Sequence, residues 1–180
     1  KSLFKKLSLS LCMAFINFFC YKKIKNNIKK NIQMSKNIEG VKITPLKIVS
    51  DHRGSVMHML RNDSEIFEKF GEIYFSTIFK DKIKAWHLHK EATLNYACVY
   101  GNVKLVLFDE RKSSSTFGVY QEIFLSLDSY SLITIPPNIW NGFKGNFDKF
   151  SIIANCLNLP HNEREMIRSD INDELFNYEW

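Results

Sequence analysis

The sequence KAWHLHK, residues 84–90, followed by TLNYACVYG, residues 93–101, carries the clearest structural signal in the chain. It is typical of a strand, a short turn and a second strand closed by a glycine. In a strand, side chains two residues apart share a face, so His87 and His89 point one way and Trp86 and Leu88 the other. The lysines at each end of the first segment favour a site for an anionic ligand with a base inside it. The alternative is an exposed edge strand whose histidines have no chemical role.

Length and charge indicate one folded domain without a nucleic-acid surface. The chain has 180 residues, enough for one domain with a substantial core and too few for two. The net charge is +6, but residues 1–33 hold eight of the 25 basic residues and no acidic residue. Residues 34–180 therefore contain 17 basic and 19 acidic residues, a net charge of −2. This balance argues against nucleic acid as a partner.

Residues 1–33 differ from the rest of the chain. Leu7 to Tyr21 is a mostly apolar run of about 15 residues between lysines, shorter than the ~20 that span a bilayer. It resembles a signal-peptide core, but lysines follow where a small-residue cleavage site belongs. We interpret residues 1–33 as a leader outside the fold and residues 34–180 as the domain. A membrane-tethering segment is the alternative, and only in that case do we expect membrane contact.

The cysteines indicate a reducing environment. Cys12, Cys20, Cys98 and Cys156 form no C-x-x-C pair, and the last two lie within apolar runs. Buried free thiols and a cytoplasmic location are therefore expected.

From Gly40 onward the pattern predicts β-structure. Short strands recur at roughly ten-residue spacing with turn signals between them, which is typical of an antiparallel sandwich or barrel. A short helix from Asp63 or Ser64 to Phe70 is also expected. The chain end from Asn162 looks helical or irregular, with aromatic residues that can pack onto the domain. The expected strands cover residues 41–46, 55–60, 72–79, 84–90, 93–100, 103–108, 120–125, 131–135 and 150–157.

The alternation also predicts a polar stripe facing the interior, which is costly unless it is hydrogen-bonded or functional. Its members are Tyr74, Ser76, His87, His89 and Tyr96. One chemistry that fits is metal binding, because His-x-His on a strand is a common half-site. A cupin metal site also needs a glutamate a few residues on and a later histidine, and Asn141 occupies the position of that histidine. We therefore expect no metal. The second chemistry is proton transfer by a histidine that a carboxylate orients.

A set of short motifs then resembles one known family. The motifs are Asp51-His52-Arg53-Gly54, Lys84-Ala85-Trp86-His87, Gly101, Ile135-Pro136-Pro137, Asn141-Gly142-Phe143 and Arg168-Ser169-Asp170. Their order and spacing, over about residues 38–180, resemble the dTDP-4-dehydrorhamnose 3,5-epimerase family. The resemblance implies an all-β, cupin-like jelly roll (a double-stranded β-helix) with short helices. It also implies a homodimer, a nucleotide-sugar substrate and no cofactor.

The resemblance assigns roles to individual residues. His87 falls on the catalytic base and Asp170 on the carboxylate that orients it. Arg53 matches an arginine that binds substrate phosphate, and Lys84 stands where the family has a second arginine. The remaining expected substrate contacts are His58 in place of a glutamate, His89 in place of a glutamine, Asn141 in place of a histidine, and Tyr74, Ser76 and Arg168.

Two family positions are not kept. Leu94 occupies the position of the family's catalytic lysine, and Ala154 that of its tyrosine acid. Tyr96 shares the inward face of its strand with Leu94, so it is our candidate for the missing acid, with Tyr74 as second choice. The alternative for Tyr96 is a core aromatic whose hydroxyl is hydrogen-bonded.

The resemblance predicts an epimerase acting on a nucleotide-linked 4-keto sugar. His87 would remove the proton at C3, C5 or both. The alternatives are a non-catalytic module that binds sugar nucleotides and an isomerase that moves the keto group.

Overall fold

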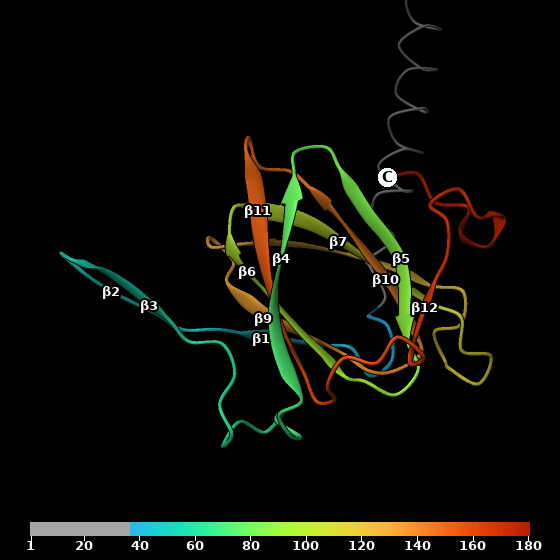
Figure 1. The fold of residues 1–180 in the computed structure, drawn as a ribbon, viewed down its shortest axis with the longest axis horizontal. Helices are drawn as coiled ribbons and strands as arrows, with labels where there is room; N and C mark the ends of the chain where they lie inside the picture. The colour runs from blue at the N-terminus through green and yellow to red at the C-terminus, as the bar shows by residue number, and fades with distance from the viewer. Residues whose placement is uncertain (1–36) are drawn as a thin grey trace, which may run out of the picture. The chain divides into compact units, whose positions relative to one another are not determined.

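The computed structural model describes residues 37–180 (Figure 1). The predicted leader, residues 1–33, lies outside the described residues. The described strands form two five-stranded sheets, in the orders β1-β9-β6-β11-β4 and β12-β5-β10-β7-β8, and a separate β2–β3 hairpin. The paired strands are antiparallel, so the predicted all-β fold is confirmed. The strands are β1 (Lys42–Pro45), β2 (Ile48–Asp51), β3 (Gly54–Met57), β4 (Glu72–Phe79), β5 (Ile83–His89), β6 (Leu94–Tyr100), β7 (Asn102–Asp109), β8 (Tyr120–Ser126), β9 (Ser131–Ile135), β10 (Ile139–Gly145), β11 (Phe150–Leu157) and β12 (Met166–Arg168), and the 3-10 helix is η1 (Glu174–Phe176).

Gly101 carries the chain from the first sheet to the second, between β6 and β7. Its φ of +76° lies in the left-handed region, which glycine adopts without a steric penalty. A Cβ atom at this position would lie 2.5 Å from the Ser151 hydroxyl oxygen. The glycine predicted to end the second strand is therefore required by both conformation and space.

The main core fills the space between the two sheets. Leu94 and Cys98 of β6 face Leu105 and Leu107 of β7 within one buried cluster. The outer face of the second sheet is covered as well. The C-terminal segment packs Phe176 against Trp86, Leu88 and Trp140 on the outside of the second sheet. This arrangement confirms that Trp86 and Leu88 face away from the histidines, and that aromatic residues of the chain end pack onto the domain.

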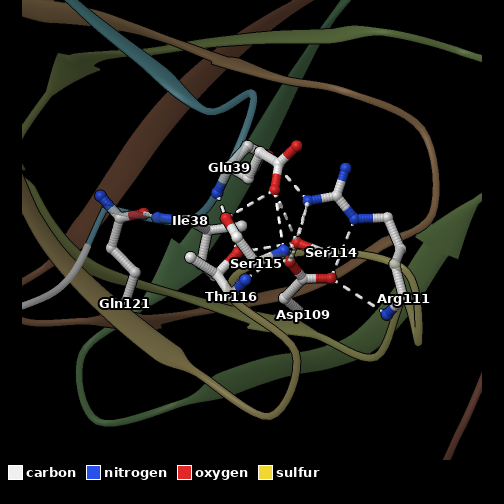
Figure 2. Close-up of polar contacts among 8 residues, drawn as sticks. All are labelled: Ile38, Glu39, Asp109, Arg111, Ser114, Ser115, Thr116 and Gln121. Carbon is white, nitrogen blue, oxygen red and sulfur yellow. Dashed lines mark hydrogen bonds and ion pairs between the residues drawn. The ribbon is translucent and has the colours of Figure 1, made fainter.

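A buried polar network attaches residues 38–39 to the β7–β8 connection (Figure 2). The fully buried Asp109 carboxylate accepts hydrogen bonds from Arg111, Ser114 and Thr116. Burial opposes its ionisation, but these hydrogen bonds outweigh burial and hold the pKa of Asp109 well below its ordinary value. The Glu39 amide donates to the Thr116 hydroxyl, which links the start of the described chain to this network.

Several local predictions are wrong. Residues 63–66 form turns and residues 67–70 have no regular structure, so the predicted helix is absent, and Phe70 is exposed. The physical reason is that the Gly71 amide already pairs with the Leu157 carbonyl at the start of the β4–β11 ladder. The segment left over is too short for a stable helix. Strands β2, β10 and β12 were not predicted.

Cys98 and Cys156 are buried free thiols, as expected. No helix among the described residues is long and apolar enough to cross a membrane.

Candidate active site

A cavity of about 470 Å³ is lined by residues from both sheets and from the segment that follows β11. Seven residues predicted from the sequence line it, and they come from four strands: Tyr74 and Ser76 of β4, Lys84, His87 and His89 of β5, Tyr96 of β6, and Arg168 of β12. The predicted polar stripe is thus present and faces a space large enough for part of a ligand.

His87 is uncharged in this environment. Burial, followed by the positive charges of His89 and Arg168, lowers the pKa of His87 to about 3. Arg168 lies directly across the β5–β12 pairing from His87, which explains its influence. A neutral imidazole can accept a proton, as a general base requires.

A hydrogen-bonded chain sets which nitrogen of His87 is free. Asn141 donates its amide protons to the carbonyl oxygens of His87 and Ile139, at 3.0 and 3.4 Å, so its Oδ1 atom faces Tyr96. The Tyr96 hydroxyl donates to that oxygen at 3.2 Å, and its own oxygen lies 3.3 Å from His87 Nε2. Because the hydroxyl proton is used on Asn141, Nε2 is the nitrogen that carries the imidazole proton. His87 Nδ1, which makes no hydrogen bond to any residue of 37–180, keeps its lone pair.

The predicted contact between Asp170 and His87 is wrong. Asp170 is exposed, and its carboxylate accepts the backbone amide of Asn172 at 2.8 Å. Among the described residues, no ion pair or hydrogen bond joins it to His87. The reason is local: Asp170 follows the end of β12, where its side chain closes a turn with residues of its own segment.

The histidine that does contact a carboxylate is His89. Its Nδ1 atom lies 2.6 Å from Glu165 Oε2, and both side chains are more than nine-tenths buried. The other Glu165 oxygen accepts the amides of Glu91 and Ala92 at 2.9 and 2.8 Å. Burial alone would raise the pKa of Glu165, but these hydrogen bonds lower it, so the carboxylate stays ionised. Sequence reasoning missed Glu165, because nothing in the run Glu163-Arg164-Glu165 distinguishes one carboxylate from the other.

The strand β4, in the sheet opposite His87, supplies a second set of polar groups. The Tyr74 hydroxyl accepts a hydrogen bond from Asn155 at 2.9 Å. Burial, and then the nearby negative charge of Glu72, raise the pKa of Tyr74, so it keeps its proton. Lys84 donates to the Ser76 hydroxyl at 3.3 Å and so connects β5 to β4.

Three predicted ligand residues do not line the cavity within this chain. Arg53 lies at the tip of the β2–β3 hairpin, which extends away from the sheets in Figure 1, and pairs with Asp51 at 2.7 Å. His58 follows the same hairpin and is exposed. Asn141 is buried behind Tyr96. Within residues 37–180, no group of three or more His, Cys, Asp or Glu side chains is arranged to hold a metal ion.

Two sheets enclosing a polar cavity with an uncharged histidine define the class: a cupin-like jelly roll with a small-molecule site. The sequence profile of the dTDP-4-dehydrorhamnose 3,5-epimerase family matches residues 35–180. The chain therefore belongs to this family of sugar-nucleotide epimerases, which are isomerases.

Individual relatives agree with this assignment. The crystal structure of a dTDP sugar isomerase from Desulfovibrio desulfuricans G20 is 36% identical, with a TM-score of 0.78 over 79% of this chain and 92% of that chain. A probable low-salt glycan biosynthesis epimerase, Agl13 of Haloferax volcanii, is 29% identical over 66% of this chain and 78% of its own length. ChmJ, a 3'-monoepimerase from Streptomyces bikiniensis solved in complex with dTDP-quinovose, shares the fold, with a TM-score of 0.71 and 18% identity over 81% of this chain and 77% of that chain.

Proposed function

We propose that this protein epimerises a nucleotide-linked 4-keto sugar at C3, C5 or both, with His87 as the base. The observation that carries the proposal is the uncharged His87, whose Nε2 is engaged by Tyr96 while Nδ1 is free at a cavity lined by polar groups. The protons on carbons next to a ketone are acidic enough for such a base. His87 takes the proton at Nδ1, and the electrons of the broken C–H bond form an enolate.

We infer that Tyr96 positions the base and that Tyr74 returns the proton. A hydroxyl in contact with the His87 ring lies on the same side of a bound sugar as the base. Inversion requires a proton from the other side. Tyr74 and Tyr96 both project from the sheet opposite His87, but the Tyr96 hydroxyl proton is donated to Asn141. The Tyr74 hydroxyl accepts a hydrogen bond from Asn155, keeps its proton and lines the same cavity. It therefore replaces Tyr96 as the preferred acid.

The charged ends of the cavity suit a sugar nucleotide. Lys84 and Arg168 place two positive side chains at the lining, where they can bind the diphosphate. Ser76, hydrogen-bonded to Lys84, is available for a sugar or phosphate oxygen. We propose, together with this substrate, that the protein needs no cofactor and that it acts in the cytoplasm.

We also propose a homodimer. Three large apolar side chains of the edge strand β4 are exposed, namely Ile73, Phe75 and Phe79. An edge strand with such a surface favours pairing with another chain. In a dimer, Arg53 and His58 on the extended hairpin could serve as the phosphate and substrate ligands that the sequence predicts.

The test is to incubate the protein with a dTDP-linked 4-keto-6-deoxyhexose in D₂O and locate deuterium by NMR. Deuterium at C3 or C5 with inverted configuration supports the epimerase. A product with its keto group at C3 supports the keto-sugar isomerase instead. Binding without any exchange supports a non-catalytic module and contradicts the proposal.

A further inference from the structure

We propose that His89, held by Glu165, is a second catalytic residue that hydrogen-bonds and protonates the ketone oxygen of the substrate while His87 acts on the adjacent carbon. This inference rests on the proposed function and assigns a role to a pair that the resemblance did not supply. The first observation is a buried nitrogen atom of His89 that has no hydrogen-bond partner among the described residues. His89 is 6% exposed and lines the cavity, yet its Nε2 atom is buried without a hydrogen-bond partner among the described residues.

The Glu165 contact determines how His89 can act. The ionised carboxylate accepts the Nδ1 proton at 2.6 Å, so that proton is fixed. The opposite nitrogen, Nε2, is then the atom that gains or loses a proton. Glu165 is itself held by two backbone amides, so it orients the ring without needing another partner.

The relative position of the two histidines indicates which substrate atom each one serves. His87 and His89 project from the same face of β5, with ring centroids 6.3 Å apart and ring planes at 84°. Two groups on one strand face approach a ligand from one side, whereas inversion at carbon requires a proton from the other side. His89 is thus placed for the oxygen beside the reacting carbon, which needs a donor when it becomes an enolate.

The charges of the two histidines are complementary in this scheme. In this scheme Glu165, 2.6 Å from His89 Nδ1, compensates the positive charge of His89 before the transfer. The step balances: His87 Nδ1 gains the carbon-bound proton, and the C–H electron pair becomes the C=C bond. The carbonyl electrons move to oxygen, which receives the Nε2 proton of His89. When a proton returns to the carbon, the ketone re-forms and the oxygen gives its proton back to His89 Nε2.

The experiment compares His89→Gln, Glu165→Gln and the double variant. We measure the rate of deuterium exchange at C3 and C5, together with the Kd of dTDP-glucose, which has no ketone. His89→Gln is expected to slow exchange by about 10²–10³-fold, as loss of an oxyanion donor typically does. The Kd of dTDP-glucose is expected to stay within about twofold, because the donor acts on charge that develops only during reaction. Glu165→Gln is expected to slow exchange less.

The double variant distinguishes two roles of Glu165, namely orienting His89 for catalysis and supporting the turn at residues 91–92 through its backbone hydrogen bonds. If Glu165 acts through His89, the double variant exchanges no more slowly than His89→Gln. The proposal is contradicted if the slowing in the double variant equals the product of the two single-variant effects. It is also contradicted if weaker binding of dTDP-glucose accounts for the slower exchange. Exchange near the wild-type rate in either single variant also contradicts it. Glu163→Gln, the same change on a neighbouring exposed residue, is the control for Glu165→Gln.

Two outcomes need separate treatment. If His89→Gln does not fold, as judged by thermal unfolding, Glu165→Gln decides the matter: slower exchange with unchanged dTDP-glucose affinity supports the dyad, and unchanged exchange overturns it. If the wild-type protein shows no exchange, the proposed function itself fails, and this inference fails with it. If the wild type exchanges and the variants match it, only the inference fails.

Discussion

His87 combines a base-like position with a pKa of about 3 in the free protein. A ligand changes the charges that cause this value. An anionic diphosphate near Arg168 offsets one positive charge, and the His87 imidazolium forms as negative charge develops on the ketone oxygen in a partly dry cavity. Charges that appear together at short range stabilise each other strongly in such a medium. The low value therefore keeps the base unprotonated at every physiological pH without preventing its action.

The same shift predicts how stability depends on pH. The folded-state pKa of His87 lies below the unfolded value of 6.5, so the unfolded chain binds more protons between these values. His87 therefore favours folding above about pH 6.5, and this contribution is lost as the pH falls toward 3, with a slope of up to about 1.4 kcal/mol per pH unit. Urea unfolding from pH 7 to 4.5 should show a shallower loss of stability for His87→Asn than for wild type. Equal slopes contradict a buried neutral His87.

Tyr96→Phe separates positioning from acid catalysis. The variant leaves His87 Nε2 and Asn141 Oδ1 without a partner, which should cost about 1–3 kcal/mol of stability. Exchange and inversion should slow together, because the base loses its orientation. If the variant exchanges normally but no longer inverts the configuration, Tyr96 is the acid, and our assignment to Tyr74 is wrong.

At the scale of elements, the Asp109 network predicts acid sensitivity in the β7–β8 connection. Because the folded-state pKa of Asp109 is lowered, its stabilisation is present above the unfolded value of 3.8 and is lost as the pH falls below it. Asp109→Asn removes the charge that Arg111, Ser114 and Thr116 surround, and should cost about 3–5 kcal/mol at pH 7. Chemical denaturation checks this value. A cost below 1 kcal/mol would show that Arg111 and the hydroxyls find other partners.

The strands show which features a sequence can predict. Alternation in β5 was enough to place His87 and His89 together, because side-chain direction in a strand is a local property. The alternation could not predict which residues contact the two histidines. That choice depends on the register of the three-residue strand β12, which sets Arg168 opposite His87 and Met166 opposite His89. Glu165 therefore reaches His89, while Asp170 lies beyond the strand. A strand this short has no periodicity of its own, and its pairing with β5 is a long-range property.

At the scale of the whole molecule, the exposed face of β4 predicts self-association. Light scattering after size exclusion should give the mass of a dimer. Phe75→Lys should shift it to a monomer, because a charge replaces a side chain that is 64% exposed in the single chain. The matched control is Phe124→Lys on β8, the edge of the second sheet, where Phe124 is 65% exposed. If both variants remain dimeric, the interface lies elsewhere.

The most direct test of the central claim is the rate at which deuterium from D₂O enters a dTDP-linked 4-keto sugar, compared between wild type and His87→Asn. A general base typically contributes about 10²–10⁴-fold. The wild type should therefore exchange at C3 or C5, and the variant should exchange more slowly by that factor. Its affinity for dTDP should be unchanged, because Lys84 and Arg168 remain in place. A folded His87→Asn variant that exchanges at nearly the wild-type rate would contradict the assignment of His87 as the base.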